Sequence, residues 1–271
     1  EKIDFLKKDK ASALDEELRL IKKYGVEVMA IFEEAYPKML REIHGAPLLL
    51  YIKGSILKEN EIGIAIVGSR RATLYGTSSA ERLGYELASR GAVVVSGLAR
   101  GIDSAGHRGA LKAHGKTIAV LGNGLSTVYP PENEEFAAEI VEKGGALVSE
   151  FPMKTPPAQQ NFPQRNRIIS GLSLAVVVVE AAKNSGALIT ADFALQQNRE
   201  VFAVPGKIDS PTSFGTNELI KEGAKLIQTA DDIISELNLK LGESAPQAGR
   251  SKAFFEPNLS RDEKIVYENL S

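Results

Sequence analysis

Short runs of apolar, mostly β-branched residues alternate with longer amphipathic segments through the middle of the chain. The apolar runs predict strands at 62–67, 92–95, 117–121, 146–148, 174–179, 200–204 and 224–227. Helical spacing predicts helices at 75–90, 102–114, 133–143, 165–172, 187–197 and 217–222. Strands without a polar face, separated by helices, indicate a mostly parallel sheet covered on both sides. The predicted fold class is α/β, doubly wound.

The two ends of the chain have different patterns. Residues 1–58 combine a helical stretch at 15–24, a short apolar element at 28–32 and an extended run at 48–54, and we interpret them as a small helical N-terminal lobe. Residues 59–240 hold the strand–helix repeat. Residues 241–271 begin as a linker, and Ser260 with Glu263 has capping-box spacing at a helix start. One helix cannot bury its apolar face alone, so we expect a truncated further domain there, and the initial Glu1 predicts a trimmed N-terminus.

The composition is that of a globular protein. Hydrophobic residues make up 43% of the 271 residues, and the net charge of −2 argues against a uniformly cationic surface, although a basic cleft can exist on a neutral protein. The absence of cysteine excludes disulfides and thiolate metal sites. No apolar run reaches membrane-spanning length and no secretory signal opens the chain, so we expect a cytoplasmic protein without a membrane partner.

The histidines carry no indication of a metal site. They lack metal-ligand spacing, and His107 and His114 are expected to be helix-surface or structural residues. We therefore expect neither a metal nor a cofactor.

Glycine, serine and basic residues follow the first predicted strand. In a doubly wound sheet, ligands bind beyond the carboxyl ends of the strands. Here Gly68 is expected to adopt a positive φ and leave the amides of the turn open, while Ser69 adds a hydroxyl and Arg70 a guanidinium. This turn predicts a phosphate site.

A second glycine-rich loop follows the next strand. Gly97 and Gly101 bracket Arg100 and suit a second backbone nest for a neighbouring phosphate. Asp103 begins the following helix, and we expect it to be structural while Arg100 faces the ligand. Similar loops after other strands together predict an anion-binding surface along one rim of the sheet.

An aromatic residue stands among cations and amides in the segment 150–170, which is predicted to be a long, proline-rich loop. Phe162 precedes Arg165, Asn166 and Arg167. This grouping is typical of a single-strand platform, in which the ring stacks a base and the cations hold the backbone. Alternatively, Phe162 anchors the loop to the core, and the two arginines pair with Glu150 and Glu180.

Motifs of known enzymes are missing from the chain. It has no Gly-x-Gly-x-x-Gly fingerprint after a strand, no Gly-x4-Gly-Lys-Ser/Thr loop and no histidine–carboxylate–nucleophile set. An enzymatic activity is therefore unsupported. Distributed cations and an aromatic loop favour an open groove for a nucleic-acid strand over a closed pocket of a nucleotide-binding enzyme or sensor, or over a scaffold for an acidic protein.

Several long motifs resemble the DNA-processing protein A family (DprA, also called Smf). They lie at 67–70 (VGSR), 96–103 (SGLARGID), 117–124 (TIAVLGNG), 149–152 (SEFP), 162–172 (FPQRNRIISGL), 180–191 (EAAKNSGALITA) and 204–206 (VPG). The resemblance covers residues 36–235. It implies an extended Rossmann-like domain that binds single-stranded DNA and helps to load the RecA recombinase during natural transformation. It also implies a homodimer, a SAM-like N-terminal lobe and a C-terminal winged helix, of which 260–271 would be the first helix.

The resemblance also implies roles for individual residues. Gly68, Ser69 and Arg70 would hold a phosphate, and Phe162 would stack a base. The complete predicted DNA-binding set is Gly68, Ser69, Arg70, Gly97, Arg100, Gly101, Lys154, Phe162, Arg165, Asn166, Arg167 and Lys183.

Overall fold

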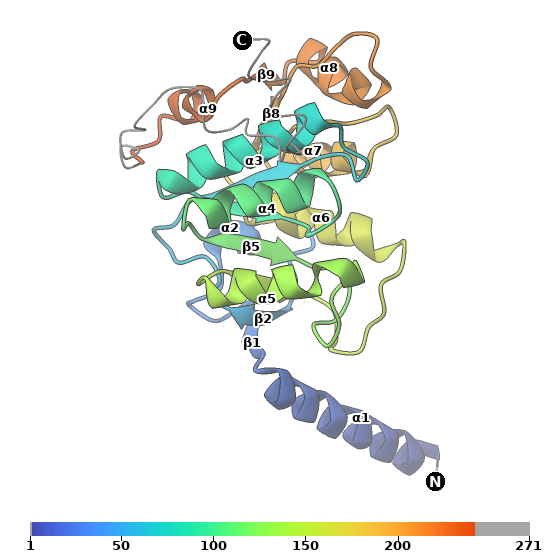
Figure 1. The fold of residues 1–271 in the computed structure, drawn as a ribbon. Helices are drawn as coiled ribbons and strands as arrows, with labels where there is room; N and C mark the ends of the chain where they lie inside the picture. Colours follow the sequence, from blue (N-terminus) through green and yellow to red (C-terminus); the bar gives the residue numbers. More distant parts are fainter. Residues whose placement is uncertain (1, 242–271) are drawn as a thin grey trace, which may run out of the picture.

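The computed structural model describes residues 2–241, with side chains from residue 12 onward. In this part of the chain, nine strands form one sheet in the order β1-β2-β6-β5-β4-β3-β7-β8-β9 (Figure 1). The parallel strands are β3 (Gly63–Val67), β4 (Val93–Ser96), β5 (Thr117–Val120), β6 (Ala146–Ser149), β7 (Ala175–Val178), β8 (Glu200–Ala203) and β9 (Lys225–Leu226). They confirm the seven predicted strands.

Helices cover both faces of the sheet. One layer consists of α3 (Leu74–Ser89), α4 (Ile102–Lys112), α5 (Glu134–Glu142) and α9 (Ala230–Glu236). The other consists of α2 (Lys38–Arg41), α6 (Asn161–Gly171), α7 (Gly186–Gln196) and α8 (Phe214–Lys221). Short 3₁₀ turns, η1 (Pro131–Asn133) and η2 (Pro211–Ser213), precede α5 and α8. Alternate residues of β3 enter opposite cores, Ile64 and Ile66 on one side and Ala65 and Val67 on the other. The doubly wound, Rossmann-like fold is confirmed.

The N-terminal segment contributes strands as well as helix. After α1 (Lys2–Tyr24), which projects from the sheet in Figure 1, β1 (Glu27–Ala30) pairs antiparallel with β2 (Leu49–Gly54), and β2 pairs antiparallel with β6. Met29, Leu50 and Ile52 are buried in the core. Two segments of the predicted helical lobe thus extend the central sheet, and the division of residues 1–58 into a separate domain stays a prediction. Apart from residue 241, the predicted linker and winged-helix start lie outside the described residues.

Helix α6 begins earlier than predicted. Residues 161–164, which precede the predicted helix at 165–172, form its first turn. Pro163 is tolerated there because amides in the first turn of a helix have no intrahelical partner. Phe162 and Arg165, three residues apart, therefore lie on the same side of a rigid helix. Within residues 2–241, we find no helix with the length and apolar character needed to cross a membrane.

Candidate functional site

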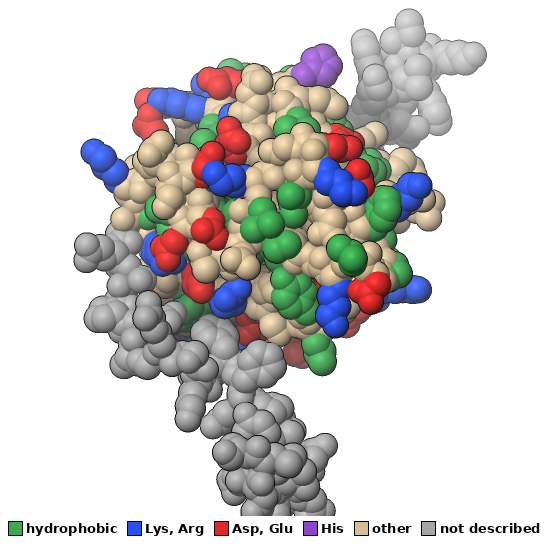
Figure 2. All heavy atoms as spheres, turned by 90° about the horizontal axis from the view of Figure 1, so that it is seen from above, with side chains coloured by type: hydrophobic (Ala, Val, Ile, Leu, Met, Phe, Trp, Pro, Cys, Tyr) green, Lys and Arg blue, Asp and Glu red, His purple; other side chains and the backbone are tan. Residues whose placement is uncertain are grey.

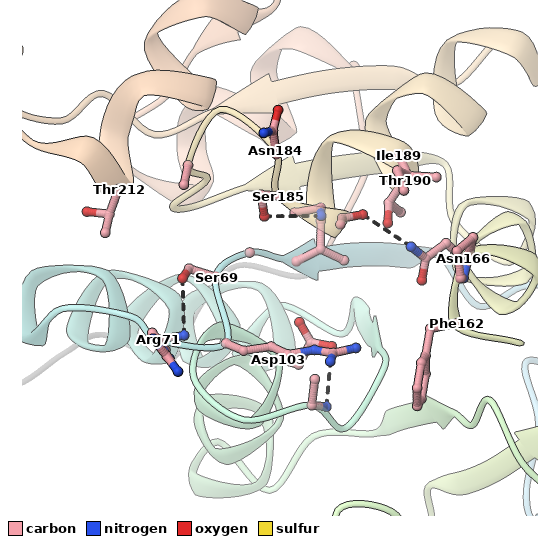
Figure 3. A pocket seen from close by; sticks show the side chains of 18 of the residues that line it. Ser69, Arg71, Asp103, Phe162, Asn166, Asn184, Ser185, Ile189, Thr190 and Thr212 are labelled. Atoms are coloured by element: carbon pink, nitrogen blue, oxygen red, sulfur yellow. Dashed lines mark hydrogen bonds between the residues drawn. The ribbon is translucent and has the colours of Figure 1, made fainter. Parts of the chain in front are cut away.

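A large cavity lies at the point where the order of the sheet reverses. The chain runs from β3 to β4 on one side and later returns to β7 on the other side of β3. Beyond the carboxyl ends of β3 and β7, the loops after both strands and the starts of α6, α7 and α8 enclose about 990 Å³ (Figure 3). Ligands of doubly wound folds bind at such switch points.

Seven of the predicted residues line this cavity. They are Gly68, Ser69, Arg70, Phe162, Arg165, Asn166 and Lys183. Among all lining residues, four are basic (these include Arg71) and Asp103 is the one acidic residue. The cavity is therefore locally cationic in a chain of net charge −2, as an anion site requires.

Glu180, at the end of β7, holds the turn that follows β3. Its side chain is buried and accepts hydrogen bonds from the amide (2.9 Å) and hydroxyl (2.5 Å) of Thr73, the N-cap of α3. Its carbonyl oxygen accepts from the amide of Ser69 at 2.7 Å. Glu180 thus joins β7 to the start of α3 and is not the partner of Arg165 considered from the sequence.

The positive φ predicted for Gly68 is wrong, because the residue is required for close packing instead. A Cβ there would lie 2.6 Å from Cγ1 of Ile102 and 2.9 Å from the carbonyl oxygen of Glu180. Since the amide of Ser69 is bound to Glu180, the predicted set of open amides is incomplete. The Ser69 hydroxyl accepts from the amide of Arg71 at 3.1 Å (Figure 3), which leaves its own proton for a ligand.

The second glycine loop packs against this turn. Gly101 has a φ of +75°, and a Cβ there would lie 2.3 Å from the carbonyl oxygen of Ser69, so only glycine fits. Arg100 does not line the large cavity. It lies with Gly97 and Phe162 around a smaller hollow of about 20 Å³, where its exposed side chain is paired with Glu132.

Arg165 is a buried structural clamp. It is 4% exposed, and Nη1 donates to the carbonyl oxygens of Gly97 (2.7 Å) and Val120, at the ends of β4 and β5. Nε donates to Oδ1 of Asn166 at 3.2 Å. Burial lowers the pKa of Arg165 to about 10, which leaves the guanidinium charged at neutral pH. A phosphate in the cavity is attracted by this charge, although Nε and Nη1 already donate to protein oxygens.

Asp103 is structural, as predicted. It is buried at the start of α4, and its carboxylate accepts from the amides of Gly97 (3.1 Å) and Ala99 (3.4 Å). Burial raises the pKa of Asp103, and the charge of Arg165 opposes this rise. The two side chains therefore stabilise one another and the Gly97 loop from inside.

Phe162 is partly exposed and lies at the junction of both cavities. Its ring covers Gly122, where a Cβ would lie 2.8 Å from Cδ1 of Phe162. The ring of Tyr129 is 5.7 Å away between centroids, and Cζ of Arg70 lies 5.0 Å from the Phe162 centroid. The ring is fixed in place and still reachable, which a base platform requires.

The structure does not bring Lys154 and Arg167 to the cavity. Lys154 pairs with Glu16 of α1. Arg167 makes a bidentate ion pair with Glu150, at 2.7 and 2.6 Å, which is the alternative considered from the sequence. Contact of either residue with DNA stays a prediction.

Sequence reasoning missed the wall opposite the Gly68–Arg70 turn. Ile189 and Thr190 of α7, Pro211 of η2 and Phe214 of α8 line the cavity there. The motif 180–191 included the first two residues. Nothing in the sequence indicated that Phe214 would be half exposed beside them.

Comparisons with known proteins identify the family to which this chain belongs. The family model described as DNA recombination-mediator protein A matches residues 27–238. Protein Smf of Escherichia coli K12 is 48% identical over 208 residues, which make up 77% of this chain and 56% of that protein. DNA processing protein DprA of Bacillus subtilis is 43% identical over 81% of this chain and 74% of its own length. This chain thus spans little more than half the length of the E. coli relative.

Two solved structures share the fold. The X-ray structure of DNA processing protein A from Streptococcus pneumoniae superposes with a TM-score of 0.75 at 40% identity, covering 81% of this chain and 77% of that one. A structure concerned with the single-stranded DNA binding mode of DNA processing protein A from Helicobacter pylori gives 0.70 at 30% identity, covering 79% and 96%. The chain therefore belongs to the DNA recombination-mediator protein A family.

Proposed function

We propose that this chain binds single-stranded DNA in the cavity beyond β3 and β7 and, in its full-length protein, helps to load RecA on incoming DNA during natural transformation. One observation carries the proposal: a hydroxyl at Ser69, a guanidinium at Arg70 and an accessible ring at Phe162 meet in one cationic cavity. The relatives support the proposal, because one is named DNA processing protein and the solved structure from Helicobacter pylori concerns single-stranded DNA binding.

The strand is held mainly by its backbone. A phosphate accepts hydrogen bonds from Ser69 and Arg70, while an adjacent base stacks on Phe162. These contacts do not read base edges, so sequence preference is weak. Affinity falls with salt because each neutralised phosphate releases counterions, with a slope of about −0.7 per phosphate for a single strand.

The chain acts without catalysis in this proposal. The two buried carboxylates nearest the turn are occupied, Asp103 by backbone amides and Glu180 by Thr73. Neither is presented as an acid or base toward the cavity. The protein works in the cytoplasm, where RecA and the incoming strand are found together.

A second copy of the chain is the expected partner at the β9 edge. Figure 2 looks onto this end of the molecule and shows hydrophobic side chains among acidic and basic ones. Leu195 (59% exposed) and Leu226 (44%) are exposed apolar residues of α7 and the edge strand. Sedimentation velocity tests the homodimer.

Thermal-shift and anisotropy measurements separate the main proposal from a nucleotide sensor. A 20-residue oligothymidine should raise the melting temperature and bind tightly, while dTMP and ATP should do neither at matched concentration. Stabilisation by a mononucleotide with no effect of the oligonucleotide would instead favour the nucleotide-binding alternative. RecA loading is tested by the RecA ATPase rate on single strands with and without the full-length protein.

A further inference from the structure

The large cavity contains a second aromatic–cation pair. Phe214, the first residue of α8, is 46% exposed and lines the cavity, and Nζ of Lys183 lies 5.7 Å from its ring centroid. Like Arg70 over Phe162, the pair places a cationic side chain beside a phenylalanine ring. Thr212, two residues before Phe214, lies across the cavity from Phe162 in Figure 3.

The wall beside Phe214 combines apolar surface with an unused hydroxyl. Ile189 and Pro211 contribute apolar groups to it. Thr190 is 2% exposed, and its hydroxyl makes no hydrogen bond to any residue that the structure describes. Figure 3 places Thr190 beside Ile189 on the cavity wall. The hydroxyl oxygen of Thr190 is not among the fully buried unpaired polar atoms of the described residues, so it is reachable from the cavity and able to bind a ligand.

The cavity is larger than one stacked base requires. Pockets for whole drug-sized ligands measure about 300–1,000 Å³, and this one reaches the upper limit at about 990 Å³. The loop before α7 also lines the cavity, and there Ser185 caps the helix and Lys183 and Asn184 are exposed. The amino end of an 11-residue helix favours negative charge at that position.

We propose that Phe214 and Lys183 form a second base-stacking platform. A single strand then crosses the cavity with one base on Phe162 and a later or earlier base on Phe214, while the intervening backbone passes over the amino end of α7. The Thr190 hydroxyl donates to, or accepts from, the base on Phe214. This inference rests on the proposed binding of single-stranded DNA, and it adds a second contact and a minimum strand length to it.

Oligothymidines of two to twelve residues, with 2-aminopurine at one position at a time, test the proposal because stacking on an aromatic ring quenches this base. With the wild type, two separated positions should be quenched in oligomers long enough to span the cavity. Phe214→Ala should restore fluorescence at one position and weaken binding of the longer oligomers about tenfold, as loss of one stacked base does. Phe214→Trp should retain both the quenching and the affinity.

Two further variants distinguish failure of the second platform from failure of the proposed single-stranded DNA binding. Ile208→Ala removes a fully exposed apolar side chain that does not line the cavity and should change nothing. Phe162→Ala should weaken oligomers of every length. If no oligomer binds the wild type, the proposed function itself fails. If Phe162→Ala weakens binding and Phe214→Ala behaves as Ile208→Ala does, only the second platform is refuted. A changed sedimentation coefficient of Phe214→Ala with unchanged DNA affinity would also refute the second platform, because Phe214 would then serve an interface between chains.

Discussion

The two ends of the cavity use the same pair of side-chain types in different surroundings. At one end, Phe162 stands on Gly122 beside Tyr129, and the buried Arg165 fixes the loops below it. At the other end, Phe214 is 46% exposed and its cation, Lys183, sits on an exposed loop. The Phe162 ring is held in place before a ligand binds, whereas the exposed side chains of Phe214 and Lys183 lose conformational entropy when a ligand binds.

This difference has an energetic consequence. Ordering a rotamer-rich side chain at an interface costs about 0.5–1.5 kcal/mol, which is subtracted from the gain of the contact. Stacking on Phe162 avoids most of this cost, while stacking near Lys183 does not. We therefore expect Phe162 to determine affinity for short strands, and Phe214 to contribute only when the strand is long enough to reach it.

Of the variants considered, Arg165→Ala should have the largest effect on stability, because the Arg165 side chain holds together the loops that support Phe162. Arg165→Ala leaves the carbonyl oxygens of Gly97 and Val120 without this buried donor, and leaving a buried polar group unsatisfied costs about 1–3 kcal/mol. We expect a loss of that size in the free energy of unfolding, measured by urea denaturation at pH 7. Oligothymidine affinity should fall as well, because the platform under Phe162 loosens.

Arg108 provides the matched control for this variant. It is an exposed arginine on α4 whose guanidinium lies over the ring of Phe136, so Arg108→Ala should cost at most about 1 kcal/mol, the value of an exposed cation–π contact. Arg165→Lys should be intermediate, because an ammonium keeps the charge but cannot match the planar fork that reaches two carbonyl oxygens. Equal stability of Arg165→Ala and the wild type would show that the clamp is dispensable.

Arg70→Ala tests the turn beside Phe162. A hydrogen bond to a charged group contributes about 1.5–3 kcal/mol, so affinity for an oligothymidine should fall at least tenfold at low salt. The slope of log affinity against log salt should become shallower by about 0.7, because one phosphate contact is lost. Thermal stability should be unchanged, since the Arg70 side chain is exposed.

Fluorescence anisotropy across a salt series measures both quantities in one experiment. Arg108→Ala again serves as the control, with the charge change of Arg70→Ala but a position away from the cavity. A salt slope identical to that of the wild type would remove Arg70 from the phosphate site, even if affinity changed.

The strands were predictable because each is a continuous apolar run bounded by glycine or polar residues. The position of the phosphate turn followed from the same pattern, since Gly68, Ser69 and Arg70 end such a run. The start of α6 was not predictable in this way. Pro163 was interpreted as part of a loop, although proline fits the first turn of a helix.

The helix decides the roles of two arginines. The interpretation of 150–170 as a loop treated Arg165 and Arg167 as equivalent cations beside Phe162, although both fall within the predicted helix 165–172. On a helix, residues two apart point about 200° away from each other, so one enters the site and the other faces away. Accordingly Arg165 reaches the carbonyl of Gly97 and Arg167 reaches Glu150. Side-chain spacing becomes informative only when the secondary structure is known.

The buried His107 should make the free energy of unfolding depend on pH. His107 is fully buried, not on the helix surface, with Nδ1 2.6 Å from Oγ1 of Thr117 and Nε2 without a hydrogen-bond partner among the described residues. Burial lowers its pKa from 6.5 to about 3. Between these values the unfolded chain binds a proton that the folded chain does not, so stability falls as the pH drops below about 6.5.

Lowering the pH from 7 to 5.5 should therefore cost about 1 kcal/mol through His107. The measurement is urea denaturation of the wild type and of His107→Gln at both pH values, and the variant should lose less stability than the wild type. His44→Gln alters an exposed histidine and should retain the wild-type loss. Equal losses in the wild type and His107→Gln would show that His107 titrates in the fold as it does in water.

Lys154→Ala should have the smallest effect, because Lys154 lies outside both ends of the cavity. Its partner is Glu16 on α1, and both side chains are largely exposed, so the ion pair contributes little to stability. Oligothymidine affinity should change by less than about twofold, the range of a surface substitution away from a binding site. Lys183→Ala, which removes a cation at the cavity, is the comparison measured in the same salt series. If Lys154→Ala weakened binding as much as Lys183→Ala, the strand would extend past α6 toward α1, and the contrast between the two rings would describe only part of its path.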